Sequence, residues 1–165
     1  MSTSLKNLSD YDPAKIPSAK KMQFGIVVSE WNPEITNGLL DGALTTLVKH
    51  GAREEDIFIK HVPGSFELPL AAKFFADHSD VDAVICLGCV IQGETRHFEF
   101  ICNAVANGIT KVNLDCDIPV IFGVLTTNTH EQAADRSGGK HGNKGVEAAV
   151  AAIKMIALHD EIRKK

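Results

Sequence analysis

The clearest fold signal in this chain is the apolar segment Ala83-Val-Ile-Cys-Leu-Gly-Cys-Val-Ile91. It contains no charged side chain, and such a run is typical of a central parallel strand that helices cover on both faces. A strand between two layers of helices has all of these side chains removed from water. We therefore expect residues 83–91 to form a strand in the middle of a parallel sheet.

Runs rich in valine and isoleucine also occur on both sides of this strand, at residues 23–29, 56–62 and 119–126. Helical patterns separate the runs, and this alternation predicts a parallel sheet. Right-handed crossovers then place helices on both faces of the sheet. The predicted fold class is α/β, a three-layer α/β/α sandwich with a central four-stranded parallel sheet (flavodoxin-like).

Apolar side chains at helical spacing predict the helices. They are expected from residue 33 to about residue 50, over residues 68–76, 98–111 and 131–136, and through a long last helix that includes residues 146–156. Asn32 is expected to cap the first helix, with Pro33 at the first helical position. A turn rich in glycine and lysine is expected before the last helix.

Length and charge limit the possible classes of protein. The chain has 165 residues, and roughly 150 residues make one domain. Residues 1–21 are polar and are expected to be an N-terminal arm without its own core, ahead of a single domain at residues 22–165. The net charge of −4 provides no global positive field for a nucleic acid or an anionic membrane. Without a spanning stretch or a secretory signal pattern, a cytoplasmic location is expected.

The sequence offers several near-matches to metal and nucleotide sites. Cys86 and Cys89 have CxxC spacing but lie within the apolar strand, where they are expected to pack as small hydrophobic residues. A segment with P-loop spacing has Glu94 where a phosphate-binding lysine is required, and the turn after the first strand lacks the glycines of a dinucleotide site. We therefore expect no metal and no cofactor.

The loops at the carboxyl ends of the strands are the expected ligand site, because open parallel sheets bind ligands there. Gly93, Glu94 and Thr95 open a helix whose free N–H groups can bind a phosphate. His97 follows in the first turn, and a histidine suits proton transfer at neutral pH. An ordinary surface or capping histidine is an equally good interpretation on these grounds alone.

Other side chains near these loops complement a phosphate site. Trp31 offers a flat face for a ring, Glu67 offers a carboxylate acceptor, and Arg136 offers a bidentate phosphate clamp. Alternatively, Trp31 anchors an interface, Phe66 closes the end of the sheet, and the segment at residues 138–145 is a solvated turn. Together the side chains favour a small phosphorylated substrate beside a planar polar ring.

Motifs in a fixed order carry a resemblance to a known family. They are Val62-Pro-Gly-Ser-Phe-Glu-Leu-Pro69, Leu87-Gly-Cys-Val-Ile-Gln-Gly-Glu-Thr-Arg-His-Phe98, Pro119-Val-Ile-Phe-Gly-Val-Leu-Thr-Thr127 and Gly142-Asn-Lys-Gly145. With these motifs the chain resembles the lumazine synthases (6,7-dimethyl-8-ribityllumazine synthases) of riboflavin biosynthesis, from about residue 24 to residue 158.

The resemblance implies a transferase that condenses 5-amino-6-(D-ribitylamino)uracil with 3,4-dihydroxy-2-butanone 4-phosphate. The products would be 6,7-dimethyl-8-ribityllumazine, phosphate and water, in the penultimate step of riboflavin biosynthesis, without a metal or an organic cofactor. His97 would be the general acid/base and Arg136 the cationic partner of the phosphate. The implied substrate-binding residues are Trp31, Ser65, Phe66, Glu67, Val90, Ile91, Gly93, Glu94, Thr95, Phe122 and Lys144.

The resemblance also implies a homo-oligomer, a pentamer whose active site is shared between neighbouring subunits. Phe122, Arg136 and Lys144 would then act on the site of a neighbour. Some members of the family assemble pentamers into icosahedral shells, and the compact segment at residues 136–145 leaves a shell sterically permitted.

Two residues depart from the family's usual pattern. Trp31 stands where the family often has phenylalanine, and its stronger stacking is expected to favour retention of riboflavin. Ser65 stands where alanine is common, and its effect stays open. Two other functions also stay open: a non-catalytic flavin-binding or shell-forming relative, and a phosphosugar enzyme of different chemistry.

Overall fold

A parallel sheet forms the centre of the computed structural model, which describes residues 7–163. Its strands are β1 (Phe24–Ser29), β2 (Ile57–Val62), β3 (Ala83–Ile91) and β4 (Val120–Thr127), in the order β2-β1-β3-β4. All neighbouring strands are parallel. The apolar run that suggested a central strand forms β3 over its whole length, which confirms that prediction.

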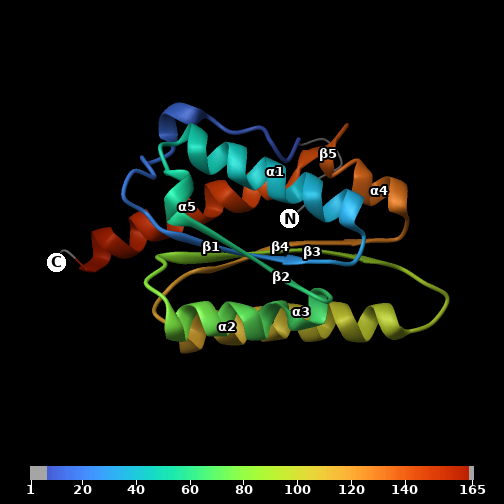
Figure 1. Ribbon diagram of the computed structural model, residues 1–165. Coiled ribbons are helices and arrows are strands. Elements are labelled where there is room, and N and C mark those ends of the chain that lie inside the picture. The colour runs from blue at the N-terminus through green and yellow to red at the C-terminus, as the bar shows by residue number, and fades with distance from the viewer. Residues whose placement is uncertain (1–6, 164–165) are drawn as a thin grey trace.

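Helices cover both faces of the sheet, so the predicted three-layer α/β/α fold is confirmed (Figure 1). One layer holds α1 (Pro33–Lys49) and α5 (Lys144–Arg163), and the other holds α2 (Leu68–His78) and α3 (His97–Asp115). Side chains of the central strands alternate between two cores, with Ile85 and Leu87 toward α1 and α5 and Val84 and Cys86 toward α2 and α3. This alternation follows from the period of two in a strand.

Several predicted boundaries differ from the observed ones. Both α2 and α3 continue beyond the predicted ends, to His78 and Asp115, whereas α4 is shorter (His130–Ala134). The end of α3 is fixed by Asn113, whose side chain exchanges hydrogen bonds with both backbone groups of Val120 at 2.6 and 2.8 Å. A tertiary contact of this kind leaves no local pattern in the sequence.

The turn before the last helix contains a small hairpin that the sequence did not predict. Strands β5 (Ser137–Gly139) and β6 (Gly142–Asn143) pair antiparallel. The Asn143 side chain donates to the carbonyl of Gly38 at 2.8 Å, which attaches the hairpin to α1. A side chain on Gly145 would overlap the carbonyl oxygen of Leu39, so this glycine permits the close approach of α5 to α1.

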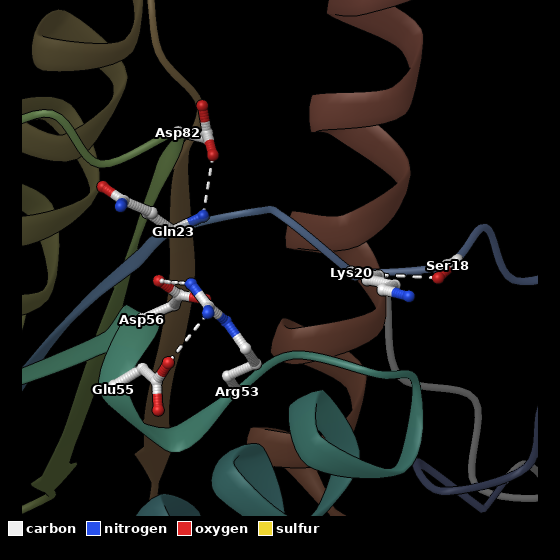
Figure 2. A network of polar contacts seen from close by, with 7 residues as sticks. All are labelled: Ser18, Lys20, Gln23, Arg53, Glu55, Asp56 and Asp82. Carbon is white, nitrogen blue, oxygen red and sulfur yellow. Dashed lines mark hydrogen bonds and ion pairs between the residues drawn. The ribbon is translucent and has the colours of Figure 1, made fainter.

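The amino ends of the strands are held by a polar network (Figure 2). Arg53 binds both carboxylate oxygens of Asp56 at 2.6 and 3.0 Å, and Asp56 is buried at the end of the short helix η2 (Glu54–Asp56). The Gln23 N–H donates to Asp82 at 2.7 Å just before β1 and β3 begin. This network therefore stabilises the edge of the sheet opposite the carboxyl ends.

Residues 7–22 pack on the layer formed by α1 and α5. They include a short helix, η1 (Pro13–Lys15), and Ala19 is buried, with its N–H donating to the carbonyl of His50 at 2.8 Å. Near the start of the described chain, Leu8 N–H donates to His141 O at 2.8 Å, and Asn143 N–H donates to Ser9 Oγ at 3.0 Å. Residues 1–6 and 164–165 of the predicted arm and domain lie outside the described residues, and the boundary after residue 21 stays a prediction. Across residues 7–163, none of the helices has the length and apolar character needed to span a membrane.

Candidate active site

The carboxyl ends of the four strands lie at one edge of the sheet, and most of the predicted site residues follow them. Trp31 follows β1, and Ser65, Phe66 and Glu67 form the short helix η3 (Ser65–Glu67) after β2. Val90 and Ile91 are the last residues of β3 and pair with Thr126 and Thr127 of β4. Gly93, Glu94, Thr95 and His97 come next, in the connection from β3 to α3.

The turn that carries Trp31 differs from its predicted form. Pro33 is the first residue of α1 as predicted, but the expected side-chain cap from Asn32 is wrong. Asn32 adopts the left-handed conformation, at φ 57° and ψ 58°, and its Nδ2 donates to the carbonyl of Cys89 on β3 at 3.3 Å. A helix N-cap residue normally has an extended backbone, and the left-handed backbone of Asn32 goes with a side chain that makes no cap hydrogen bond. Trp31 is left with 72% of its surface exposed.

Trp31 and Glu67 both border the backbone at Gly64. A Cβ placed on Gly64 would lie 3.2 Å from Oε2 of Glu67 and 3.4 Å from Cδ1 of Trp31. A side chain at this position would therefore crowd the carboxylate and the indole. An aromatic surface and a carboxylate acceptor thus lie near each other at the ends of β1 and β2, with Phe66 exposed beside them.

Beneath this surface, Ser29 and Ser65 are buried and their hydroxyl groups have no hydrogen-bond partner among the described residues. Both approach Gly88 of β3, where an added Cβ would lie 2.6 Å from Ser65 Oγ and 3.3 Å from Ser29 Oγ. The missing side chain at Gly88 therefore allows η3 to pack directly on β3.

The loop between β3 and α3 is exposed from Gln92 to His97. An added Cβ on Gly93 would meet nothing within 4 Å, so open space surrounds this residue. Thr95 Oγ1 accepts from the His97 N–H at 3.4 Å. His97 is the first residue of α3, where N–H groups without intrahelical partners and the helix dipole both favour an anion.

A second group of predicted site residues lies along the outer edge of β4 and consists of Phe122, Arg136 and Lys144. They line a cavity of about 420 Å³, to which the other predicted site residues do not contribute. Arg136 donates through Nη1 to the carbonyl of Gln132 at 2.9 Å, and Lys144 pairs with Glu147 at 2.7 Å. Two cationic side chains and an aromatic ring thus share one opening at the edge of the sheet.

Sequence reasoning missed several residues that shape this cavity. Glu147 lies three residues after Lys144 on α5, a spacing that brings two helical side chains together and that the sequence does contain. Leu8 also lines the cavity, but only the folded chain brings it near Arg136. Its contribution therefore left no signal in the sequence.

Comparisons with known proteins agree with these motifs. The profile of the 6,7-dimethyl-8-ribityllumazine synthase family matches residues 21–160. A protein of that name from Cytophaga hutchinsonii is 61% identical over 157 residues, which cover 95% of this chain and 98% of the relative. A protein of the same name from Parabacteroides distasonis is 56% identical over 94% of this chain, and one from Porphyromonas gingivalis is 53% identical over 96% of this chain. The match covers 98% of each of these two relatives.

The chain belongs to the 6,7-dimethyl-8-ribityllumazine synthase family. It is an enzyme, a transferase of riboflavin biosynthesis. The resemblance that the motifs carried is thereby confirmed, whereas the roles of individual residues stay predictions.

The thiols of this lumazine synthase family member have little reactive character near the site. Burial raises the pKa of Cys86 to about 12, and burial together with the charge of Glu34 raises the pKa of Cys89 to about 12. Both thiols therefore remain protonated near neutral pH. Within residues 7–163, histidine, cysteine and acidic side chains form no group of three or more that could hold a metal ion.

A hydrogen bond between side chains joins the start of α1 to α4. Nε2 of His130 lies 2.7 Å from Oε1 of Glu34, and both side chains are exposed. A hydrogen bond from the backbone and the bond to His130 lower the pKa of Glu34. In this lumazine synthase fold, the pair connects the turn after β1 to the segment that leads to Arg136.

Proposed function

We propose that this enzyme condenses 5-amino-6-(D-ribitylamino)uracil with 3,4-dihydroxy-2-butanone 4-phosphate to give 6,7-dimethyl-8-ribityllumazine, phosphate and water. This is the penultimate step of riboflavin biosynthesis. The observation that carries the proposal is the meeting of the Trp31 indole and the Glu67 carboxylate at Gly64, in a chain of this family. The first suits a planar heterocycle, and the second suits the hydroxyl groups of a ribityl chain.

The pyrimidine substrate stacks on Trp31 and extends its ribityl chain toward Glu67. Ser65 and Phe66 line the same subsite, and Val90 and Ile91 border the edge of the ring. Support for this assignment comes from the common position of these residues at the carboxyl ends of β1, β2 and β3. The exposure of Trp31 and Phe66 leaves their aromatic faces available to a ligand.

The phosphate of the second substrate binds at the start of α3. Gly93, Glu94 and Thr95 supply backbone N–H groups, and Arg136 supplies a guanidinium group that can bind phosphate through two hydrogen bonds. The open space at Gly93 supports this assignment, since an anion can approach the backbone there. The helix dipole adds a local attraction that the net charge of the chain does not provide.

His97 moves protons during the reaction. The 5-amino group attacks the ketone and water leaves, which forms an imine. His97 then takes a proton from the carbon next to the imine, and the C–O bond to the phosphate breaks, so that phosphate leaves with the electron pair. Elimination leaves an enol, which becomes a ketone when its terminal carbon takes up the proton that His97 returns. The ribitylamino nitrogen attacks this new carbonyl carbon, and loss of a second water completes the ring. Holding the two reactants together supplies much of the rate, because oriented reactants reach high effective molarities.

The enzyme is a homo-oligomer, a pentamer, in which Phe122, Arg136 and Lys144 complete the site of a neighbouring subunit. The separate cavity that these three residues line at the edge of β4 supports this arrangement. Apolar side chains exposed on the layer of α2 and α3 offer area for association: Leu70, Phe74 and Phe100. Burial of such side chains between subunits removes them from water.

We also propose that the enzyme works in the cytoplasm. Its four cysteines are unpaired thiols, and a reducing compartment keeps such thiols reduced.

The direct test combines the purified enzyme with both substrates and follows lumazine fluorescence together with released phosphate. We expect one phosphate for each lumazine. Riboflavin binding without lumazine formation would instead support a flavin-binding relative. Phosphate release that does not depend on the pyrimidine would support a different phosphosugar chemistry.

A further inference from the structure

Trp31 lies between two residues that are attached to different strands. On one side, the N–H of Glu30 donates to the carbonyl of Val62, the last residue of β2, at 2.9 Å. On the other side, the Asn32 side chain donates to the carbonyl of Cys89 in β3 at 3.3 Å. The backbone on either side of the indole is thus fixed to strands that flank β1.

The backbone of Asn32 contributes a second constraint. Asn32 and Lys21 are the non-glycine residues with positive φ in the part of the chain that the structure describes. Asparagine enters the left-handed region more readily than most residues, because its short side chain forms local hydrogen bonds. Here the Asn32 carbonyl also accepts the N–H groups of Ile35 and Thr36, at 2.9 and 3.0 Å. One residue therefore ends the turn after β1, begins α1 and contacts β3.

We propose that Asn32 is a positioning residue that fixes the direction of the Trp31 indole for stacking on the pyrimidine substrate, an inference that rests on the proposed function. Because Trp31 is 72% exposed, packing restrains its side chain little. Its direction then depends on the backbone of residues 30–32. A ring that is already oriented binds its ligand without first losing that freedom.

Substitutions can separate the contributions that the side-chain amide of Asn32 and its left-handed backbone make to the direction of the indole. Glycine accepts positive φ without steric cost, so Asn32→Gly keeps the turn and removes the bond to Cys89. Aspartate also tolerates this conformation, but Asn32→Asp presents an acceptor to the carbonyl oxygen that now receives a hydrogen bond. Both variants therefore release the turn from β3 by different means. Asn37→Asp is a matched control. Asn37 is exposed on α1, and its substitution adds the same negative charge as Asn32→Asp.

The test uses the intrinsic fluorescence of the enzyme as well as its activity. Trp31 is the single tryptophan of the chain, so time-resolved fluorescence anisotropy reports on this indole alone. In Asn32→Gly and Asn32→Asp we expect faster local depolarisation of the indole. We also expect the KM for 5-amino-6-(D-ribitylamino)uracil to rise about tenfold while kcat changes less than about twofold, since stacking contributes to binding of the ring. Asn37→Asp should match the wild type in both measurements.

Unchanged anisotropy and unchanged KM in both Asn32 variants would overturn the proposal. So would a fall in kcat and in Tm with no change in indole motion, because that result indicates a structural role only. If the wild-type enzyme forms no lumazine, the proposed function is wrong. The anisotropy of the variants then decides by itself whether Asn32 orients Trp31.

Discussion

Ser65 packs so closely on Gly88 that a Cβ added to the glycine would lie 2.6 Å from the serine Oγ. Gly88 belongs to β3, and Ser65 begins the short helix that carries Phe66 and Glu67. Leu68 is the next neighbour, with its Cδ1 at 2.9 Å from the same added Cβ. The position of the predicted ribityl subsite therefore depends on a glycine in the central sheet.

Gly88→Ala should destabilise the enzyme by roughly 1–3 kcal/mol, because the added methyl group overpacks a tight contact. The free energy of unfolding in urea measures this loss. Adding Ser65→Ala removes the nearest atom, so the double variant should lose less stability than the sum of the two single variants. Additive losses would contradict the direct contact.

His97→Ala should reduce kcat by roughly ten- to a hundredfold, below the ~10²–10⁴ of full acid/base catalysis, because reactant positioning remains intact. Steady-state formation of lumazine gives the value. His159→Ala is the matched control, since His159 lines a cavity with Ile118 and Pro119 at the amino end of β4, opposite the carboxyl ends. An unchanged kcat in His97→Ala would remove this histidine from the mechanism.

Arg136→Ala should reduce activity more than His97→Ala, because the phosphate charge loses its cationic partner. Mixed oligomers test whether the two residues serve one site from different subunits. In random assemblies of the two variants, about a quarter of the sites would pair an intact His97 with an intact Arg136 across a boundary. Co-expression should therefore restore activity well above that of either variant alone. Activity no higher than the mean of the two would place both residues in one subunit.

Trp31→Phe should weaken riboflavin binding about two- to tenfold, since the smaller ring loses stacking area. Riboflavin fluorescence during titration with each protein gives the dissociation constants. The Phe66→Leu variant tests whether loss of any nearby exposed ring has the same effect. Equal affinity in the wild type and Trp31→Phe would exclude the indole as the flavin contact.

Cys86 and Cys89 should resist alkylation at pH 8 until the enzyme unfolds, because pKa values of about 12 keep both thiols protonated. Iodoacetamide labelling followed by peptide mass spectrometry measures the modification. Thiols in an unfolded chain ionise near pH 8.5. The folded state therefore loses stability relative to the unfolded chain as pH rises above about 8.5. Rapid labelling of either residue under native conditions would show that the strand opens.

The sequence predicted the sheet well because its main signal is physical and local. The uncharged run that became β3 can be stable only when it is covered on both faces. Asn32 shows the opposite case, since asparagine favours both helix caps and left-handed turns. Which of these two roles Asn32 adopts depends on the carbonyl of Cys89, which is distant in the sequence and near only in the fold.

The candidate site was predictable only in part for the same reason. The loops at the carboxyl ends follow from the topology of a parallel sheet, which the strand pattern contains. The joint cavity of Phe122, Arg136 and Lys144 follows from the path of the chain around β4, which no spacing encodes. The hairpin between Arg136 and Lys144 was missed because glycine-rich segments carry a weak strand signal.

The contacts of Leu8 and Ser9 with His141 and Asn143 limit where a tag or label can be attached to this protein. A purification handle or fluorescent reporter fused close to Leu8 would strain the wall of the Arg136 opening, although the fusion point is far from Arg136 in the sequence. A long, flexible linker between the fusion and Leu8 would leave that wall unchanged. A fusion attached directly at Leu8 would lower the catalytic activity without unfolding the α/β/α domain.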